Sequence, residues 1–564
     1  MTFAAGIDVG NATTEVVLGK LDRDGFDVVA ADRAPTRRSK GSPESLAGAA
    51  ALVRRLERRT GVRVSSAVAA PLRPVETATG SLPEERASTG RLRAVATGAA
   101  TAGGSGSGAG RPVRFGDPVH GDDPVVVVVP SGHRYDDVAA ALSELAGSGR
   151  LSAILLEDDE AVLVANRLPS GVPVVDEVPP GDVLSSARVA VEVPADGRPL
   201  QVLTDPLKLA TLLRLEAGEV SDAAALAAQL FDAPNAVVTS SRPEPEPVPD
   251  LPSASAGWIE VDGTRLPFLA GHESLRTGRV GAVDAYALPP DLESRSVDDL
   301  WTVDLGAVAS AVVARRSAAV DRPVALAAMH TTAGWSDPAA ALSELLGVPV
   351  VTAPSEALAA RAGALTTPGA PTDAVVVDLG GGTIDVISVE GAVVAAGAGD
   401  LLTASVASLT GGSRAAAEWV KRGPAHRVEA PQVLLAEDGG RGFLDRPAPF
   451  DTVGSLVVQG PTGMLGFSRT MAPGEWRALR LRLKTELVGG NVARALRSLG
   501  TSPRTVVVVG GSAGDDEVLA AVTGALPRGT AVARGAVGNT LGHRYAVAHG
   551  LLRWADPPRR DAGA

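Results

Sequence analysis

Two segments far apart in the sequence share the same spacing of a carboxylate, a glycine and a threonine. Residues 6–16 read GIDVGNATTEV and residues 376–386 read VVDLGGGTIDV. With Asp8 aligned to Asp378, the matched or similar pairs are Gly10 with Gly380, Thr13 with Thr383, Glu15 with Asp385 and Val16 with Val386. The repeat predicts two facing β-hairpins that hold a polyphosphate, because glycines let backbone N–H groups approach anionic oxygens while apolar strands fix the loops.

The chemistry expected of these hairpins is the binding and hydrolysis of a nucleoside triphosphate. Asp8 and Asp378 are the candidate catalytic residues, since carboxylates at strand ends can hold a hydrated Mg²⁺ through water. Asp378 can also position the attacking water. Loop amides and hydroxyls supply the candidate phosphate contacts, which are Gly10, Asn11, Thr13, Thr14, Gly380, Gly381, Gly382 and Thr383.

A third glycine turn follows the valine run at residues 506–509. Gly510, Gly511 and Ser512 form a turn where adenosine can lie against the backbone. Asp515 can contact ribose or cap the next helix. One such turn after a strand is usually only a tight turn, but the three in this order predict an ATP or ADP site. No G-x-x-x-x-G-K-[ST] motif is present, so a P-loop is not expected.

The elements that must position these turns alternate along the chain. Valine-rich runs such as residues 125–129 are followed by helical patterns such as residues 135–146, where Val138, Leu142 and Leu145 fall on one face. This alternation is typical of α/β proteins. With 564 residues, 45% hydrophobic and 21% charged, the chain is expected to form several domains with buried cores.

Charge and cysteine content exclude several classes of function. A formal charge of −12 disfavours nucleic acid and anionic membrane as partners. The basic stretch at residues 477–484 is interpreted as a solvated helix face. The absence of cysteine excludes disulfides, thiolate metal sites and cysteine nucleophiles. Neither a secretory segment nor an apolar run of membrane-spanning length is found, so a cytoplasmic protein is expected.

Composition also divides the chain. The glycine-rich residues 103–110 are expected to form a flexible connection and the Pro/Glu-rich residues 243–252 a stiff linker. The Pro- and Arg-rich tail after Trp554 is expected to fray. The predicted domains are a core in three parts (residues 1–92, 246–424 and 474–564), an inserted domain with its linker (93–245) and a smaller Gly/Pro-rich insert (425–473).

The three glycine turns resemble the phosphate-one, phosphate-two and adenosine motifs of the actin/sugar-kinase/Hsp70 superfamily. The resemblance implies an α/β fold with a duplicated, ribonuclease H-like ATPase core. Residues 355–369 (SEALAARAGALTTPG) look like the first connecting helix of that superfamily, where small residues permit close helix contact and hinging. Taken alone, the same segment is an ordinary alanine-rich core helix.

Longer stretches resemble the large subunits of diol/glycerol dehydratase reactivases in particular. The resemblance implies an ATP-dependent, chaperone-like factor that releases damaged cobalamin from an inactivated adenosylcobalamin-dependent diol or glycerol dehydratase, so that intact cofactor can bind. It also implies a reactivase small subunit as partner, in an α2β2 hetero-oligomer. The stretches are GIDVGNATTEV at 6–16, EALAARAGALTTPG at 356–369, NVARALRSLG at 491–500 and GNTLGHRYAVAHGLL at 538–552.

The resemblance continues through EDDEAVLVANRLPSGVPVVDEV at residues 157–178, which matches an inserted swivelling domain that carries a divalent cation near the small-subunit contact. Carried over by position, the metal ligands are Thr101, Asp159 and Asp176, and the ion is Mg²⁺ or Ca²⁺. Hydroxyl and carboxylate oxygens suit both ions, and an unfilled shell can recruit a partner's carboxylate. Without the resemblance, residues 158–160 form a polar turn between strands at 153–156 and 161–164.

Three other functions fit the same superfamily. An Hsp70-like peptide chaperone is disfavoured, because little sequence follows the adenosine motif. A small-molecule kinase would need a catalytic aspartate and a sugar pocket between the lobes, and neither is located in the sequence. A filament-forming actin relative would polymerise with ATP, which is not expected here.

Overall fold

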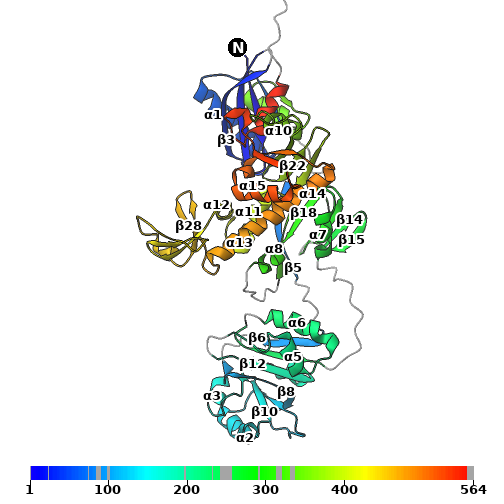
Figure 1. Cartoon of the computed structure of the whole chain (residues 1–564), viewed down its shortest axis with the longest axis vertical. Coiled ribbons are helices and arrows are strands. Elements are labelled where there is room, and N and C mark those ends of the chain that lie inside the picture. Colours follow the sequence, from blue (N-terminus) through cyan, green and yellow to red (C-terminus); the bar gives the residue numbers. More distant parts are fainter. Residues whose placement is uncertain are drawn as a thin grey trace, which may run out of the picture. The chain divides into compact units, whose positions relative to one another are not determined.

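The protein folds into two compact units. The first is built from Met1–Leu82, Pro252–Val313 and Asp321–Ala564, and the second mainly from Pro83–Leu251. Both are drawn in Figure 1, where the chain is coloured from blue to red along the sequence. This computed structural model describes residues 2–22, 25–73, 75–83, 90–97, 102–195, 199–230, 233–241, 257–289, 292–312, 321–330 and 337–555.

Two five-stranded sheets of the first unit share one topology. Their strand orders are β20-β4-β1-β2-β3 and β23-β22-β21-β29-β30. In each sheet the first three strands in sequence pair antiparallel, and two further strands add in parallel beside the first. The expected α/β fold with a duplicated core is therefore confirmed. The strands are β1 (Thr2–Val9), β2 (Thr13–Leu21), β3 (Phe26–Pro35), β4 (Ser66–Ala69), β20 (Val350–Thr352), β21 (Val375–Leu379), β22 (Thr383–Ile387), β23 (Ala392–Ala396), β29 (Thr505–Val509) and β30 (Ala531–Arg534).

Each of these sheets opens with the same tight hairpin. In the first, Gly10 N donates to Thr13 O at 3.0 Å, and in the second, Gly380 N donates to Thr383 O at 3.0 Å. The largely apolar strands β1 and β21 that carry the turns are mostly buried, so the turns have fixed supports. The predicted pair of hairpins is confirmed.

Two helices lie between the two sheets and join them. The small side chains of α10 (Glu356–Ala364) and α16 (Ala546–Leu551) pack into one core with strands of both sheets. A Cβ on Gly363 would lie 1.9 Å from Ala546 O, and one on Gly550 would lie equally close to the backbone of α10. The helices therefore touch through their backbones, and the expected connecting helix is confirmed as α10.

Other helices cover the outer faces of both sheets. The first sheet packs on α1 (Pro43–Thr60) and α9 (Pro338–Leu346). The second packs on a larger core, which also includes the sheets β18-β19-β5 and β15-β14-β16-β17. The elements of that region are β5 (Val75–Pro83), β14 (Trp258–Val261), β15 (Thr264–Pro267), α7 (Phe268–Thr277), β16 (Val283–Ala287), β17 (Arg295–Ser296), β18 (Asp299–Asp304), α8 (Leu305–Ser310), β19 (Asp321–Met329), α11 (Gly399–Thr410), α12 (Arg414–Val420), α13 (Pro473–Lys484), a π-helical turn (Thr485–Gly489), α14 (Gly490–Leu499) and α15 (Asp516–Ala525).

A small antiparallel sheet occupies the region expected to be an insert, and it is the yellow element of Figure 1. Its order is β26-β25-β24-β27-β28. Phe443 and Phe450 on this insert are 81% and 88% exposed, which is unusual for phenylalanine. The strands are β24 (His426–Ala430), β25 (Val433–Leu435), β26 (Arg441–Phe443), β27 (Leu456–Gly460) and β28 (Gly463–Ser468).

Two of the four cations in the basic stretch of α13, Arg480 and Lys484, are buried, which corrects its interpretation as a solvated helix face, while Arg477 and Arg482 are exposed as expected. Arg480 donates to Glu437 of the insert and to Glu517 of α15 at 2.5–2.9 Å. Lys484 donates to Asp515 and Glu517 at 2.6 and 2.7 Å. The carboxylates that pair with Arg480 and Lys484 come from segments distant in sequence, so nothing local to the helix indicates that these two cations are paired.

The second unit contains one eight-stranded sheet in the order β6-β13-β12-β8-β9-β10-β11-β7. The predicted strand at residues 125–129 and the helix that follows it are confirmed as β9 and α2. The linker expected at residues 243–252 lies outside the described residues. The elements are β6 (Leu92–Thr97), β7 (Ala102–Gly103), β8 (Gly106–Arg114), β9 (Val125–Val129), α2 (Tyr135–Gly147), β10 (Leu151–Leu156), α3 (Ala161–Ala165), β11 (Val174–Val175), α4 (Pro180–Leu184), β12 (Arg188–Val193), α5 (Pro206–Leu213), α6 (Val220–Gln229) and β13 (Ala236–Ser240).

Two sequence-based expectations for this unit are wrong. The glycine-rich residues 103–110 were expected to be flexible, but most of them belong to β8, in the interior of the sheet. A Cβ on Gly108 would lie 2.0 Å from Ser152 O, so glycine is required there by a close neighbour. The strand expected at 161–164 is the helix α3.

Among the described residues, no helix combines the length and the apolar composition needed to cross a membrane.

A buried ion pair joins β18 to α14 in the larger core. The side chains of Arg494 and Asp299 are both 0% exposed, and Arg494 Nη2 donates to Asp299 Oδ2 at 2.7 Å. Backbone amides of Gly281 and Ala396 also donate to Asp299, at 3.0 and 2.8 Å. The pair therefore fixes three separate segments around one carboxylate.

We expect Arg494→Met to lower the free energy of unfolding by about 3–5 kcal/mol, because it leaves the Asp299 carboxylate buried without its cation. Urea denaturation followed by circular dichroism measures this loss. The matched control is Arg441→Met, whose partner Glu429 lies on the surface of the insert, and it should leave stability nearly unchanged. Equal stability of the two variants would contradict the importance of the buried pair.

Candidate functional site

A cavity of about 470 Å³ opens between the two hairpins of the first unit. Its walls are the β1–β2 turn, the β21–β22 turn, the turn after β29, the starts of α10 and α11, the end of α12 and the segment before α16. Only the folded chain brings these segments together. The residues predicted from sequence that line it are Asp8, Gly10, Asn11, Thr13, Asp378, Gly380, Gly381, Gly382, Thr383, Gly510, Gly511, Ser512 and Asp515.

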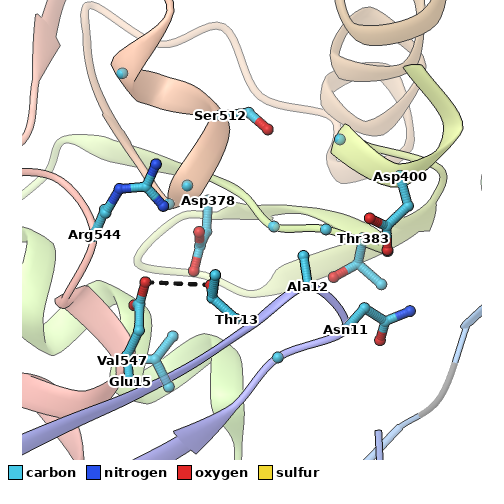
Figure 2. A pocket seen from close by; sticks show the side chains of 18 of the residues that line it. Asn11, Ala12, Thr13, Glu15, Asp378, Thr383, Asp400, Ser512, Arg544 and Val547 are labelled. Carbon is cyan, nitrogen blue, oxygen red and sulfur yellow. Dashed lines mark hydrogen bonds between the residues drawn. The ribbon is translucent and has the colours of Figure 1, made fainter. Parts of the chain in front are cut away.

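The two hairpin turns face each other at close range. Figure 2 shows Ala12 and Thr383 on the opposing loops. A Cβ on Gly381 would lie 3.1 Å from Ala12 N, and one on Gly382 would lie 2.7 Å from Asn11 Nδ2. The second turn therefore needs glycines, since any side chain would displace the first turn.

Thr14 does not line this cavity, which corrects the prediction that its side chain contacts a phosphate. Successive side chains of a strand point to opposite sides, so Thr13 and Glu15 face the cavity and Thr14 faces away. The Thr14 hydroxyl lies 3.0 Å from Thr36 Oγ1 instead. Its role is to hold β2 against the end of β3.

Four carboxylates from the two hairpins gather at the cavity floor. Directly opposite positions pair Asp8 with Glu15 and Asp378 with Asp385. Burial raises the pKa of Asp8 and Asp378 well above the ordinary value, and raises the pKa of Glu15 and Asp385 to about 7. Asp8 Oδ1 and Asp385 Oδ1 are buried and accept no hydrogen bond from the described residues.

Among the described residues these carboxylates do not form a cluster that ligates a metal ion directly, but they can accept hydrogen bonds from the water shell of a hydrated cation. Buried carboxylate oxygens without donors are unfavourable, and the O–H groups of water bound to Mg²⁺ would supply those donors. Asp8 and Asp378 are the carboxylates that would hold such an ion.

Lys40 is the buried cation of the carboxylate cluster. Its Nζ donates to Glu356 Oε2, at the start of α10, at 3.1 Å. Burial alone lowers the pKa of Lys40, but the Glu356 and Asp8 carboxylates outweigh burial and raise it, so the ammonium group is charged at neutral pH. The sequence analysis did not assign either residue to the site: no motif surrounds Lys40, and Glu356 begins a segment that was interpreted only as a connecting helix.

The glycine turn after β29 closes another side of the cavity. Gly510 has a φ of 89°, and a Cβ there would lie 2.3 Å from Asp378 Oδ1. Its amide donates to His543 O at 2.8 Å, which ties the turn to the segment before α16. Asp515 Oδ1 accepts from the amides of Glu517 and Val518, so of its two predicted roles the capping role is the one observed.

The wall formed by the start of α11 and the end of α12 carries polar groups that the sequence analysis also missed. Lys421 Nζ, just after α12, lies 2.7 Å from Glu418 Oε2 and donates to Thr403 Oγ1 at 2.8 Å. Asp400 at the start of α11 lines the same wall, and burial raises its pKa. The only sequence signal was the spacing of Glu418, Lys421 and Arg422, which resembles an ordinary ion-paired helix face.

The predicted metal ligands of the second unit lie at one edge of its sheet. Asp176 follows β11, and its Oδ2 accepts from Ala161 N at the start of α3 at 3.2 Å. Asp159 lies in the turn just before α3 and is exposed. Thr101 lies outside the described residues. In the described part of the chain no group of three acidic or histidine side chains is arranged to hold a metal ion directly, so a cation at this edge would need further oxygen ligands.

Comparisons with known proteins agree with this architecture. Residues 280–555 match the family model of the diol dehydratase reactivase ATPase-like domain, and residues 94–244 match that of the DD-reactivating factor swiveling domain. The chain is 29% identical to the propanediol dehydratase-reactivating factor large subunit of Citrobacter freundii over 604 aligned positions, covering 98% of each chain.

Solved structures give the same result. The diol dehydratase-reactivating factor in nucleotide-free form is similar with a TM-score of 0.70 and 27% identity, over 98% of this chain and 99% of that one. A glycerol dehydratase reactivase is similar with a TM-score of 0.69 and 26% identity, over the same shares. Together with the duplicated core and the facing turns, these matches show that the chain belongs to the family of diol/glycerol dehydratase reactivase large subunits.

Proposed function

We propose that this chain binds ATP and ADP between its two hairpins and couples ATP hydrolysis to the reactivation of an adenosylcobalamin-dependent diol or glycerol dehydratase. The observation that carries the proposal is the pair of matched turns facing each other above buried carboxylates. Glycine turns bind phosphate through backbone amides. Membership of the reactivase family supports the choice of client enzyme.

The nucleotide would lie across the whole cavity. Its phosphates would lie between the turns at residues 10–13 and 380–383, where glycines leave the backbone accessible. Its adenosine would lie against Gly510, Gly511 and Ser512. The polar groups on the wall formed by the start of α11 and the end of α12, such as Lys421, would be available to the ribose hydroxyls. The cavity volume of about 470 Å³ lies within the range of small-molecule sites, roughly 300–1,000 Å³.

Hydrolysis in this site would depend on positioning and charge. Asp8 and Asp378 would hold the hydrated Mg²⁺, and Asp378 would orient the attacking water. Lys40 would offset the negative charge that develops on the transferred phosphoryl group. When bound, Mg²⁺ supplies charge neutralisation at the β- and γ-phosphate oxygens.

Reactivation requires that nucleotide state change the affinity of this chain for its partners. The proposed partner is a reactivase small subunit, in an α2β2 hetero-oligomer, held in part by a Mg²⁺ or Ca²⁺ ion at Asp159 and Asp176, with Thr101 as a further ligand. Hydrolysis can drive exchange only if ATP and ADP forms bind the small subunit differently. The contact between α10 and α16 would be the hinge about which the two sheets move. Exchange would release damaged cobalamin from the dehydratase.

We expect Asp378→Asn to lower the ATPase rate at least about a hundredfold, because the variant cannot position the water or the hydrated metal ion. Phosphate release from the purified protein measures the rate. The matched control is Asp373→Asn, which removes one charge from an exposed position just before β21 and should leave the rate unchanged. An unchanged rate in Asp378→Asn would remove Asp378 from the mechanism.

For the second unit, we expect Asp159→Asn combined with Asp176→Asn to weaken small-subunit binding at least about tenfold, because both carboxylate ligands are lost. Calorimetry with the separately purified small subunit measures the affinity. Glu160→Gln, in the same turn, serves as the control. Equal affinities, or insensitivity of the wild-type complex to EDTA, would contradict the metal site.

The client is tested directly by reactivation. We expect the chain with its small subunit, ATP, Mg²⁺ and fresh adenosylcobalamin to restore activity to a glycerol-inactivated dehydratase, and the same mixture without ATP to restore little. Dehydratase activity over time is the measurement. Full recovery without this chain, or none with it, would reject the proposed function.

A further inference from the structure

Arg544 enters the cavity from the segment just before α16, and it plays no part in the functions assigned above. Figure 2 shows its guanidinium pointing toward the interior, on the same side as Glu15 and Asp378. Its position is well defined, because Gly510 N donates to the carbonyl of the preceding residue, His543, at 2.8 Å. A Cβ on Gly511 would lie 3.0 Å from Arg544 Nη1, so the guanidinium lies directly against that turn.

Three of the other cations that line the cavity already have carboxylate partners, whereas Arg33, which also lines it, makes no side-chain ion pair with the described residues. Lys40 pairs with Glu356 at 3.1 Å, and Arg73 pairs with Asp298 at 2.5 Å. Lys421 pairs with Glu418 at 2.7 Å. Their charges are therefore compensated before any ligand arrives.

Arg544 differs, because its guanidinium makes no hydrogen bond or ion pair with the described residues. The charge of Glu15 acts on Arg544, but no ion pair joins the two side chains, and Glu15 Oε1 accepts from Thr13 Oγ1 at 3.4 Å instead. Arg544 is half-buried, and burial together with the neighbouring Arg33 lowers its pKa. A partly desolvated cation with unused donors is unfavourable unless an anion completes it.

Because no carboxylate of the described residues forms an ion pair with Arg544, the anion that completes it would come from the ligand. Arg544 lies between the turn at Gly511 and the hairpin residue Glu15, so the cavity lies directly in front of its donors. A planar guanidinium can donate two parallel hydrogen bonds to a phosphate. Adenosine alone carries no charge that would satisfy it.

We propose that Arg544 binds a phosphate oxygen of the nucleotide and is the main side-chain cation for polyphosphate in this site. The proposal rests on the proposed nucleotide function and names a residue for it. It also explains a charge arrangement: the Glu15 carboxylate on the first hairpin repels phosphate, and the nearby Arg544 guanidinium compensates that charge.

The test compares ligands that differ only in phosphate. ADP, AMP and adenosine are titrated by calorimetry into wild-type protein, Arg544→Gln, Arg544→Lys and the control Arg553→Gln, which removes an exposed cation from the next helical turn. We expect Arg544→Gln to weaken ADP binding about tenfold or more, consistent with loss of a charge-assisted hydrogen bond. Adenosine binding should stay within about twofold, and Arg544→Lys should recover part of the ADP affinity.

Two results would overturn the proposal. ADP affinity in Arg544→Gln equal to that of the control would show that the guanidinium does not bind phosphate. A parallel loss for ADP and adenosine would show that it contacts the base or ribose instead. Thermal unfolding without ligand checks that the variant is folded, and failure of wild-type protein to bind ADP would reject the nucleotide site itself rather than the role of Arg544.

Discussion

The backbone contact between α10 and α16 is the constraint on which the cavity depends. Gly363 and Gly550 let the two helices touch without intervening side chains, and both helices pack between the duplicated sheets. The distance between the sheets is therefore set by main-chain atoms, which cannot be repacked as side chains can. Because each sheet carries one hairpin, the same contact determines how closely the two turns face each other.

The cavity that results is rich in carboxylates and short of free cations. Burial raises the pKa of the hairpin carboxylates, and Lys40 is committed to Glu356. Such a site is unfavourable when empty, since its charges are neither hydrated nor fully paired. The proposed ligand, a metal-bound polyphosphate, would supply both the cation that the carboxylates lack and the anion for the loop amides and Arg544. The protein's charges are thus complemented only when the metal ion and the phosphates are bound together.

The sequence predicted the parts of this site that are encoded locally. The hairpin turns and the glycine turn after β29 were found because strand, glycine and hydroxyl residues follow one another directly. Lys40, Glu356 and Arg544 were missed, because each becomes part of the site only through tertiary contacts. The same reason explains the errors: Gly108 was taken as flexible although a neighbouring strand requires it, and Arg480 was taken as solvated although its partners lie on two distant turns.

The ion pairs of α13 have a consequence for how this protein can be modified. Arg480 donates to both Glu437 in the insert and Glu517 in α15. Lys484 donates to both Glu517 and Asp515, and the Asp515 side chain caps α15, just after the glycine turn that follows β29. The insert therefore cannot be exchanged for that of a relative without regard to its contact with α13. Excising it, or grafting a homologous one without an acidic residue at the turn that holds Glu437, would leave the buried Arg480 guanidinium with Glu517 but without Glu437, beside the proposed nucleotide site. Recombination points for chimeric reactivases belong elsewhere in the chain.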